Sequence, residues 1–492
     1  MSIKDRLKTV FKSRDEFDLT SGGVAKPLFY LSLPIVITNL LQTAYNLVDT
    51  FWLGRYSDES LAAISFAFPM VFLLISLGMG LAVAGSVLVA QNTGANKPEE
   101  AEYAASQVTT FSLLGSLVLG GIAYFLVDDF LALTGASDTV VGLATSYMEV
   151  ISLGLVFMFG FFTFIFLMRG YGDTITPMLV MFGSVVLNII LDPFMIFGWG
   201  PFPELGIQGA AVATIFSRSL AMFVGLFIML YMTYGVQINA RDMVPDFSFF
   251  KKILRIGAPA SFETTGRALS INALLFIVGM FADPVAAAFG IGARVLSVIF
   301  LPAAAIAQGV ETMTGQNIGA GKPDRVERTN HLAARTMFVI LTTMGVVTWV
   351  FAEPIVAVFT DSPEIIEEGA TFMRYVAPTF GFMGVMRAYV GGIRGTGKTV
   401  TAAVITVVIV GMARLLIAYF GAVEIGALGI WVAFGASNII GATVAFLWFR
   451  RGTWREMDLT EDDVDAEKEV ETDADADKDK DTDTPRPTES HD

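Results

Sequence analysis

The chain has 492 residues, of which 54% are apolar and only 16% charged, and its formal net charge is −15. Soluble proteins carry about 25% charged residues, so this composition excludes a sizeable soluble domain. The sequence has no cysteine, and its only histidines are His331 and His491. Disulfides, thiolate catalysis and Cys-ligated metals are therefore excluded, and little remains from which to build a His-ligated zinc site or a Ser-His-Asp triad.

The first segment, 1–27, is charged over its first 17 residues and has no apolar core with a cleavage site. We expect it to be cytoplasmic rather than a signal peptide. Apolar runs of the roughly 20 residues that cross a bilayer then recur along the chain. They predict an N-terminal lobe over 28–236, a polar cytoplasmic linker over 237–250 and a C-terminal lobe over 251–450.

Breaks at glycine, proline and charge clusters divide the apolar runs into helices. The expected helices are 28–53, 60–92, 101–127, 137–168, 174–198 and 207–236, followed by 251–280, 284–317, 325–351, 363–392, 398–421 and 426–450. The expected fold class is therefore all-α and integral to the membrane, with about twelve transmembrane helices in two six-helix lobes.

The last segment, 451–492, is strongly acidic. From Asp458 to Asp492 it holds sixteen acidic against four basic residues, and it has no aromatic residue after Val470. Such a segment buries too little apolar surface to fold, so we expect a disordered cytoplasmic tail. A solubilising extension is favoured over a regulatory or partner-binding tail.

The basic residues give the orientation. Nineteen Lys and Arg residues lie in the segments on the side of the N-terminus, against Arg55 alone among the segments on the other side. Because basic residues accumulate in cytoplasmic loops, both termini are expected in the cytoplasm. We expect a multi-pass protein of the plasma (inner) membrane.

The two halves repeat each other at an offset of 225 residues. The offset pairs Gln91-Asn92-x-Gly94-Ala95-x-Lys97-Pro98 with Gln316-Asn317-x-Gly319-Ala320-x-Lys322-Pro323, and Arg169-Gly170-x-Gly172-x-Thr174 with Arg394-Gly395-x-Gly397-x-Thr399. Six predicted helices separate the matched positions, so the repeats have the same orientation in the membrane. Parallel internal repeats of this kind are a recurrent architecture of secondary transporters.

These paired loops, together with Leu191-Asp192-Pro193 and the following Gly206-x-x-Gly209-Ala210-Ala211-x-Ala213-Thr214, resemble the MATE (multidrug and toxic compound extrusion) transporters. The resemblance spans about 20–450. It implies a V-shaped pair of six-helix lobes that exchanges organic cations or other toxic compounds for Na⁺ or H⁺.

Within that family the sequence looks closer to the DinF-like branch. This resemblance implies a cation site in the N-terminal lobe, on the first, fifth and sixth helices, and a bending proline in the first helix that matches Pro34. The matching site positions are Tyr45, Asp49, Asn188, Asp192 and Thr214. The carboxylate site of the NorM-like branch is not expected, because the predicted helix 363–392 has no acid beyond Glu368.

The same site residues stand out on physical grounds alone. An ionised carboxylate inside a bilayer costs roughly 2.5–3.5 kcal/mol on insertion scales, so intramembrane acids are functional candidates. Asp49, Asp192 and Thr214 are expected at a similar depth along their helices, and Asn188 shares a helix face with Asp192 at the i, i+4 spacing. Carboxylate, amide and hydroxyl oxygens suit a hard cation such as Na⁺. Two buried like charges equally favour proton binding, and solvated or helix-capping aspartates are the structural alternative.

A second set of intramembrane charges lies in the C-terminal half. Glu263 and Arg267 have the i, i+4 spacing, and Arg374 and Arg414 are expected at similar depths. We expect a structural charge cluster here rather than a substrate contact.

The segment Gly392–Thr399 matches the phosphate-binding pattern G-x-x-x-x-G-K-[ST]. That chemistry needs a preceding strand, whereas a transmembrane helix is predicted there, so we interpret the segment as a cytoplasmic turn and expect no ATP-driven pumping.

We therefore predict a secondary antiporter that exports small amphipathic or cationic compounds in exchange for Na⁺ or H⁺. It is expected to act as a monomer in the lipid bilayer, with no cofactor and no nucleic-acid partner. The alternative within transport is a flippase for lipid-linked precursors, which a cavity lined by many cationic residues would favour. A membrane-embedded enzyme is the alternative from another class, and it lacks the expected catalytic constellation.

Overall fold

The computed structural model describes residues 12, 16–132, 136–455 and 459. Most of the predicted N-terminal segment before residue 16 and most of the predicted acidic tail lie outside the described residues. Over the described ranges every regular element is a helix, as the sequence predicts.

The N-terminal lobe contains seven helices: α2 (Ala25–Tyr56), α3 (Asp58–Gly94), α4 (Pro98–Ala132), α5 (Asp138–Leu153), α6 (Leu155–Tyr171), α7 (Ile175–Phe197) and α8 (Ile207–Tyr231). The C-terminal lobe contains α9 (Phe247–Val278), α10 (Asp283–Gly319), α11 (Pro323–Val350), α12 (Ala352–Ala357), α13 (Pro363–Val376), α14 (Phe380–Gly395), α15 (Thr399–Ala403), α16 (Ala413–Ile425) and α17 (Ala427–Arg450). A π-helical stretch, Val404–Met412, joins α15 to α16.

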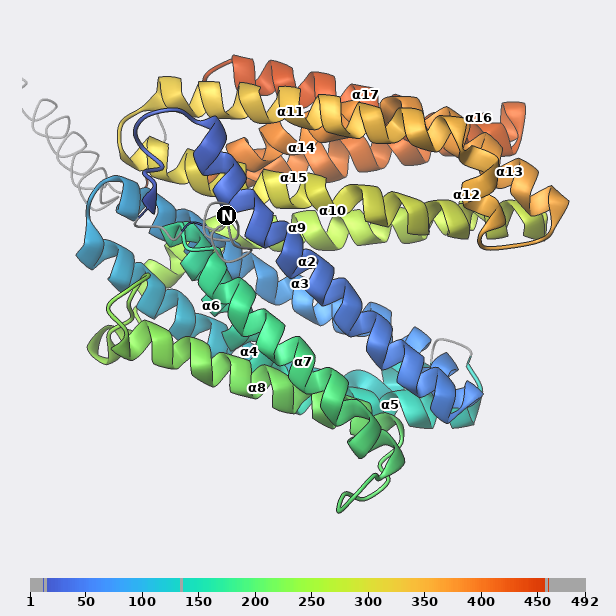
Figure 1. Ribbon diagram of the computed structural model, residues 1–492, viewed down its shortest axis with the longest axis horizontal. Helices are drawn as coiled ribbons and strands as arrows, with labels where there is room; N and C mark the ends of the chain where they lie inside the picture. The colour runs from blue at the N-terminus through green and yellow to red at the C-terminus, as the bar shows by residue number, and fades with distance from the viewer. Residues whose placement is uncertain (1–11, 13–15, 133–135, 456–458, 460–492) are drawn as a thin grey trace, which may run out of the picture.

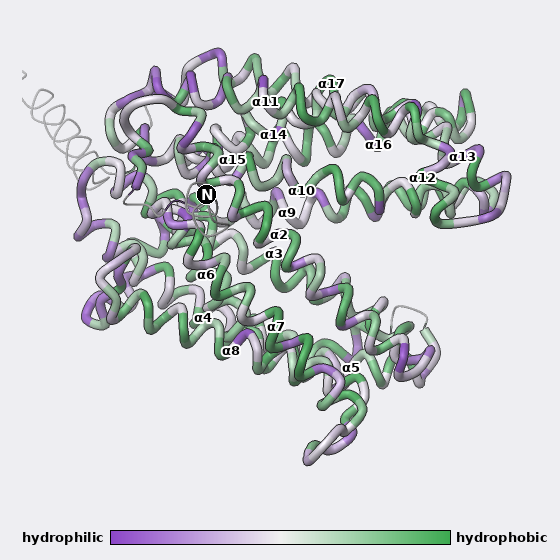
Figure 2. The backbone as a smooth tube through the Cα atoms, viewed as in Figure 1, coloured by the Kyte–Doolittle hydropathy of each residue, from purple (hydrophilic) through white to green (hydrophobic). Residues whose placement is uncertain are grey.

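Nine helical spans within the described residues are long and apolar enough to cross a membrane, and the bent pair α5 and α6 makes ten. The two further passes that the sequence predicts, α9 and the stretch from α13 through α14, fall outside this set. Both carry several charges, such as Glu263 and Arg387, among their apolar residues. Figure 2 shows hydrophobic helix bodies with hydrophilic segments gathered at the two ends of the molecule, the pattern of a bilayer-spanning protein.

The predicted helix 137–168 differs most from the structure. It breaks at Gly154, where α5 and α6 meet at an angle of 55°. Glycine is a weak helix former, so a break there costs little. The predicted helices 363–392 and 398–421 are also interrupted, the first by a 3₁₀ turn over Ala377–Thr379 and the second by the π-helical stretch.

The two lobes lie against each other at one end and diverge towards the other (Figure 1). The first end holds the connection between α8 and α9, and we call it the linker end; the other is the open end. The connection includes a 3₁₀ turn, Ala240–Met243, and Asp246 caps α9 by accepting hydrogen bonds from the backbone N–H groups of Ser248 (2.9 Å) and Phe249 (3.2 Å). Hydrogen bonds from the Ser248 and Tyr103 hydroxyls help lower the pKa of Asp246 from 3.8 to about 2.

The repeat-related loops of the two halves meet at the linker end. The Gln91 side-chain amide donates to the carbonyl oxygen of Gly395 (3.2 Å), and that of Gln316 donates to the carbonyl oxygen of Gly170 (3.0 Å). Each glutamine therefore binds the arginine–glycine loop of the other lobe. Helices α3 and α10 cross so closely that a Cβ on Gly94 would lie 1.9 Å from the Gln316 carbonyl oxygen, and one on Gly319 would lie 1.9 Å from that of Gln91. We call this reciprocal contact the linker-end seal.

Candidate functional site

The predicted site residues converge inside the N-terminal lobe, where α2, α7 and α8 meet. Asp49 lies on α2, Asn188 and Asp192 on α7, and Thr214 on α8. The Thr214 hydroxyl donates to Asp49 Oδ2 (3.4 Å), and the Asn188 amide donates to Asp192 Oδ1 (2.9 Å). The helix depths and the i, i+4 spacing thus predicted the convergence of these four residues.

The site is buried, with Asn188 and Asp192 at 0% exposure and Asp49 at 6%. Both aspartates lie inside their helices and are buried, which favours a shared polar site over solvated or helix-capping aspartates. Four enclosed oxygens at the site have no hydrogen-bond partner among the described residues. They are Tyr45 OH, Asp49 Oδ1, Asn188 Oδ1 and Asp192 Oδ2. A buried polar atom without a partner is costly, so these oxygens are available to a ligand that enters the site.

The arrangement fits either of two small ligands. Carboxylate, amide and hydroxyl oxygens are the donors that Na⁺ prefers. Two buried carboxylates in one site equally suit a bound proton, because burial and like charge both favour the neutral form of a carboxyl group. Within the described residues no cluster of three or more His, Cys, Asp or Glu side chains could hold a metal ion.

Arg218, which the sequence analysis missed, is the buried positive charge nearest this site. It lies on α8, one turn after Thr214, and is 2% exposed. Its guanidinium stacks over the Tyr45 ring (4.5 Å to the centroid) and donates to Gln42 Oε1 (2.9 Å). An arginine in the middle of the apolar segment 207–236 was the signal that could have found it.

The other two residues named from the family resemblance, Tyr45 and Pro34, are buried on α2. Tyr45 is 2% exposed and lies one turn before Asp49, while Pro34 is buried within α2, where its carbonyl oxygen accepts a hydrogen bond from Thr38 (2.9 Å). A cavity of about 300 Å³ extends from Tyr45 and Asp49 to the other lobe, where Gln308 lines it.

The charges of the C-terminal lobe are arranged differently from the expectation. Glu263 forms an ion pair with Arg394 (2.9 Å), not with Arg267, and Arg394 also binds Glu311 (3.0 Å). Arg374 does not join this group, because it is paired with Glu353 (2.8 Å) at the open end of the lobe. The i, i+4 spacing was misleading because Arg394, from the end of α14, reaches Glu263 first.

The phosphate-binding pattern has no phosphate-binding structure. Its first residues end helix α14, and α15 begins at Thr399, so no strand precedes the loop. The Lys398 ammonium donates a hydrogen bond to the carbonyl oxygen of Thr453. The segment is a turn at the linker end, as expected.

Comparison with known proteins agrees with this architecture. The MatE family model matches residues 34–194 and 259–420, one match in each lobe. The chain is 30% identical to the probable multidrug resistance protein NorM of Thermotoga maritima, over 88% of this chain and 94% of that protein. It is 28% identical to the probable multidrug resistance protein YpnP of Bacillus subtilis, over 90% of this chain and 98% of that protein.

A solved outward-facing structure of a multidrug resistance MATE family transporter superimposes with a TM-score of 0.81. That match has 26% identity and covers 90% of this chain and 98% of the other. The paired loops, the two lobes and the family match in each of them lead to one conclusion: this chain belongs to the MATE family of multi-pass membrane transporters, and it is not an enzyme.

Proposed function

We propose that this protein is an antiporter that exports small amphipathic or cationic compounds in exchange for Na⁺ or H⁺. In this proposal Asp49, Asn188, Asp192 and Thr214 bind the coupling ion, as expected for the DinF-like branch. The transporter works as a monomer without a cofactor, in the plasma membrane, with the linker end in the cytoplasm.

The main support is the charge balance of the buried site. Asp49 and Asp192 bring two negative charges and Arg218 one positive charge, all at 6% exposure or less. With both carboxylates ionised, one negative charge remains unbalanced in a medium where charge is costly. One Na⁺ or one proton restores neutrality. The lobe therefore has two electrostatic states, a negatively charged site without the ion and a neutral site with it.

The cavity beside the site supports coupling between ion and substrate. Asp49 and Thr214 belong both to the ion site and to the cavity wall, which also contains Tyr45 and apolar side chains such as Met158 and Phe162. An amphipathic cation in this cavity and an ion at Asp49 would compete for the same negative charge. Competition of this kind gives exchange, because each ligand stabilises the conformation that it binds better.

Transport in proteoliposomes tests the proposal. With a fluorescent amphipathic cation, we expect uptake or release driven by a Na⁺ gradient or by a pH gradient, each imposed separately. Transport that follows the substrate gradient alone, with no response to either ion, would refute antiport.

Cysteine labelling tests the orientation, since no native cysteine interferes. A single cysteine at Arg241 should react with an impermeant reagent only from the cytoplasmic side, and one at Asp58 only from outside. The reverse labelling would invert the proposed orientation.

A further inference from the structure

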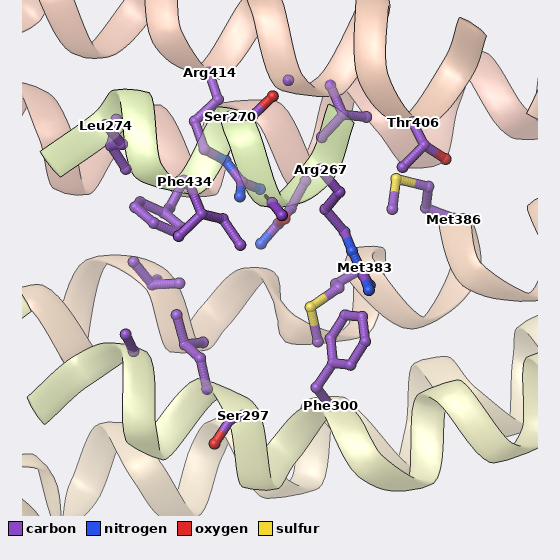
Figure 3. Close-up of a pocket in the computed structure, with 18 of the residues that line it drawn as sticks. Arg267, Ser270, Leu274, Ser297, Phe300, Met383, Met386, Thr406, Arg414 and Phe434 are labelled. Carbon is purple, nitrogen blue, oxygen red and sulfur yellow. Dashed lines mark hydrogen bonds between the residues drawn. The ribbon is translucent and has the colours of Figure 1, made fainter. Parts of the chain in front are cut away.

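The C-terminal lobe lines a second cavity, of about 340 Å³, between α9, α10, α14, the π-helical stretch, α16 and α17, with Phe72 of the N-terminal lobe also in its wall (Figure 3). Three arginines line it, Arg267, Arg387 and Arg414, and the described residues that form its wall include no aspartate or glutamate. The remaining wall is mostly apolar, with Phe300, Phe434, Met383 and Met386 labelled in Figure 3.

The arginines are held by aromatic rings rather than by carboxylates. The guanidinium carbons of Arg387 and Arg267 lie 4.1 Å and 5.2 Å from the centroid of the same ring, Phe300. That of Arg414 lies 4.4 Å from the Phe434 centroid, and its nitrogens donate to Ser437 and Asn438. Stacking orients a guanidinium but leaves its N–H groups free to donate.

The nearby carboxylates do not neutralise this cavity. Glu263 and Glu311 are both bound by Arg394, so a single arginine already engages both acids. Among the described residues, Arg267 and Arg387 have no ion pair or hydrogen-bond partner, and the enclosed Nε of Arg387 is unpaired. Unpaired cations within a membrane are rare and mark ligand sites or ion pathways.

The internal repeat gives independent support. The offset of 225 residues pairs Arg267 with Gln42 and Arg387 with Phe162, and it pairs Leu274 with Asp49. All six residues line their own lobe's cavity. The two cavities are therefore repeat counterparts. The carboxylate of Asp49 is replaced by the apolar Leu274, and the neutral side chains of Gln42 and Phe162 are replaced by the guanidinium groups of Arg267 and Arg387.

From the three arginines and this inversion, we propose that the C-terminal cavity binds an amphipathic organic anion, whose carboxylate, sulfonate or phosphate group receives the guanidinium N–H donors while its aromatic or alkyl body packs against Phe300, Met383 and Met386. The size and the mainly apolar wall suit a small ligand with one polar head. This inference deepens the proposed export function by naming a substrate class for the second lobe. The anion reaches the cavity from water or as the headgroup of an anionic lipid.

Binding measurements without any ion gradient test the site. The protein, in nanodiscs of phosphatidylcholine, is titrated by calorimetry with naphthalene-2-sulfonate and with its cationic counterpart, 2-naphthyltrimethylammonium. Arg387→Gln should weaken binding of the sulfonate roughly ten- to hundredfold, as loss of a charge-assisted hydrogen bond predicts. Arg387→Lys should retain part of the affinity, which separates loss of charge from loss of fold.

Arg374→Gln is the matched control, because Arg374 is on the same lobe but is paired with Glu353 outside the cavity wall. It should leave sulfonate binding unchanged. Asp49→Asn should do the same, so failure of ion coupling and failure of the anion site are distinguishable. Equal binding of the sulfonate to wild type and Arg387→Gln would overturn the proposal. Tighter binding of the cation than of the sulfonate to the wild type, lost in Arg387→Gln, would also overturn it.

A second arm identifies the source of the anion. Nanodiscs that contain phosphatidylglycerol are analysed by native mass spectrometry and by the same titration. Retention of phosphatidylglycerol by the wild type but not by the double variant Arg267→Gln/Arg387→Gln, with displacement by the sulfonate, supports the site with a lipid as its ligand. Sulfonate binding with no such retention supports the site with a water-borne anion. Absence of both kinds of Arg-dependent binding refutes it.

Discussion

A methyl group at Gly319 should open the linker-end seal. A Cβ there would lie 1.9 Å from the Gln91 carbonyl oxygen, whereas real Cβ contacts essentially never fall below 3.0 Å. Helices α3 and α10 must therefore separate by about 1 Å, and overpacking of this kind typically costs about 1–3 kcal/mol. Alanine also favours the helix, but we expect α10 to stay helical when the seal opens, so that gain does not bias the equilibrium.

The clash exists only while the seal is closed. Gly319→Ala should thus shift the equilibrium away from the conformation described here by roughly 5- to 150-fold. Spin labels on single cysteines at Glu99 and Arg328, two exposed positions at the linker end of opposite lobes, report the separation by double electron–electron resonance. The population at long distance should increase.

Gly290→Ala is the control, since Gly290 lies on the same helix with open space where a Cβ would stand. It should leave the distance distribution unchanged. An unchanged distribution in Gly319→Ala, or an equal shift in both variants, would refute the reasoning that close backbone contact limits opening.

Five further variants test other parts of the molecule. Asp49→Asn and Asp192→Asn should abolish transport driven by an ion gradient while the proteins still insert and fold, whereas Glu263→Gln should keep substantial coupling; coupling lost only in Glu263→Gln would move the ion site to the C-terminal lobe. Lys398→Ala should leave gradient-driven transport intact, and ATP hydrolysis that is lost with this change would contradict that expectation. Asp246→Ala should lower the melting temperature at pH 7. Because folding lowers the pKa of Asp246 to about 2, that deficit should persist above pH 4 and narrow as the pH falls towards 2, where the wild-type carboxylate is protonated. If the decrease in melting temperature were the same at every pH, its cause would be lost packing and not the loss of the ionised carboxylate.

The apolar runs and the distribution of charge predicted most of the fold. The depth of each residue along its helix predicted that Asp49, Asn188, Asp192 and Thr214 lie together. The helix breaks were harder, since a 55° bend at Gly154 depends on neighbours that lie far away in the sequence. The position of Arg218 beside the Asp49 site was not predicted, because it depends on which face of α8 is directed towards α2 and α7. The pairing of Glu263 with Arg394 could not be inferred either, because it joins α9 to the far end of α14 and displaces the local i, i+4 partner.

The linker-end seal has a consequence for the origin of the chain. Gln91 binds the loop of the second half, and Gln316 binds the loop of the first, so the same contact is made twice with the roles exchanged. Contacts exchanged in this way are what a two-fold axis imposes on identical subunits. A homodimer of a single half, produced before gene duplication, could have closed by the same pair of contacts. Each half of today's chain accordingly carries both a glutamine and an arginine–glycine loop, the two parts that the contact requires.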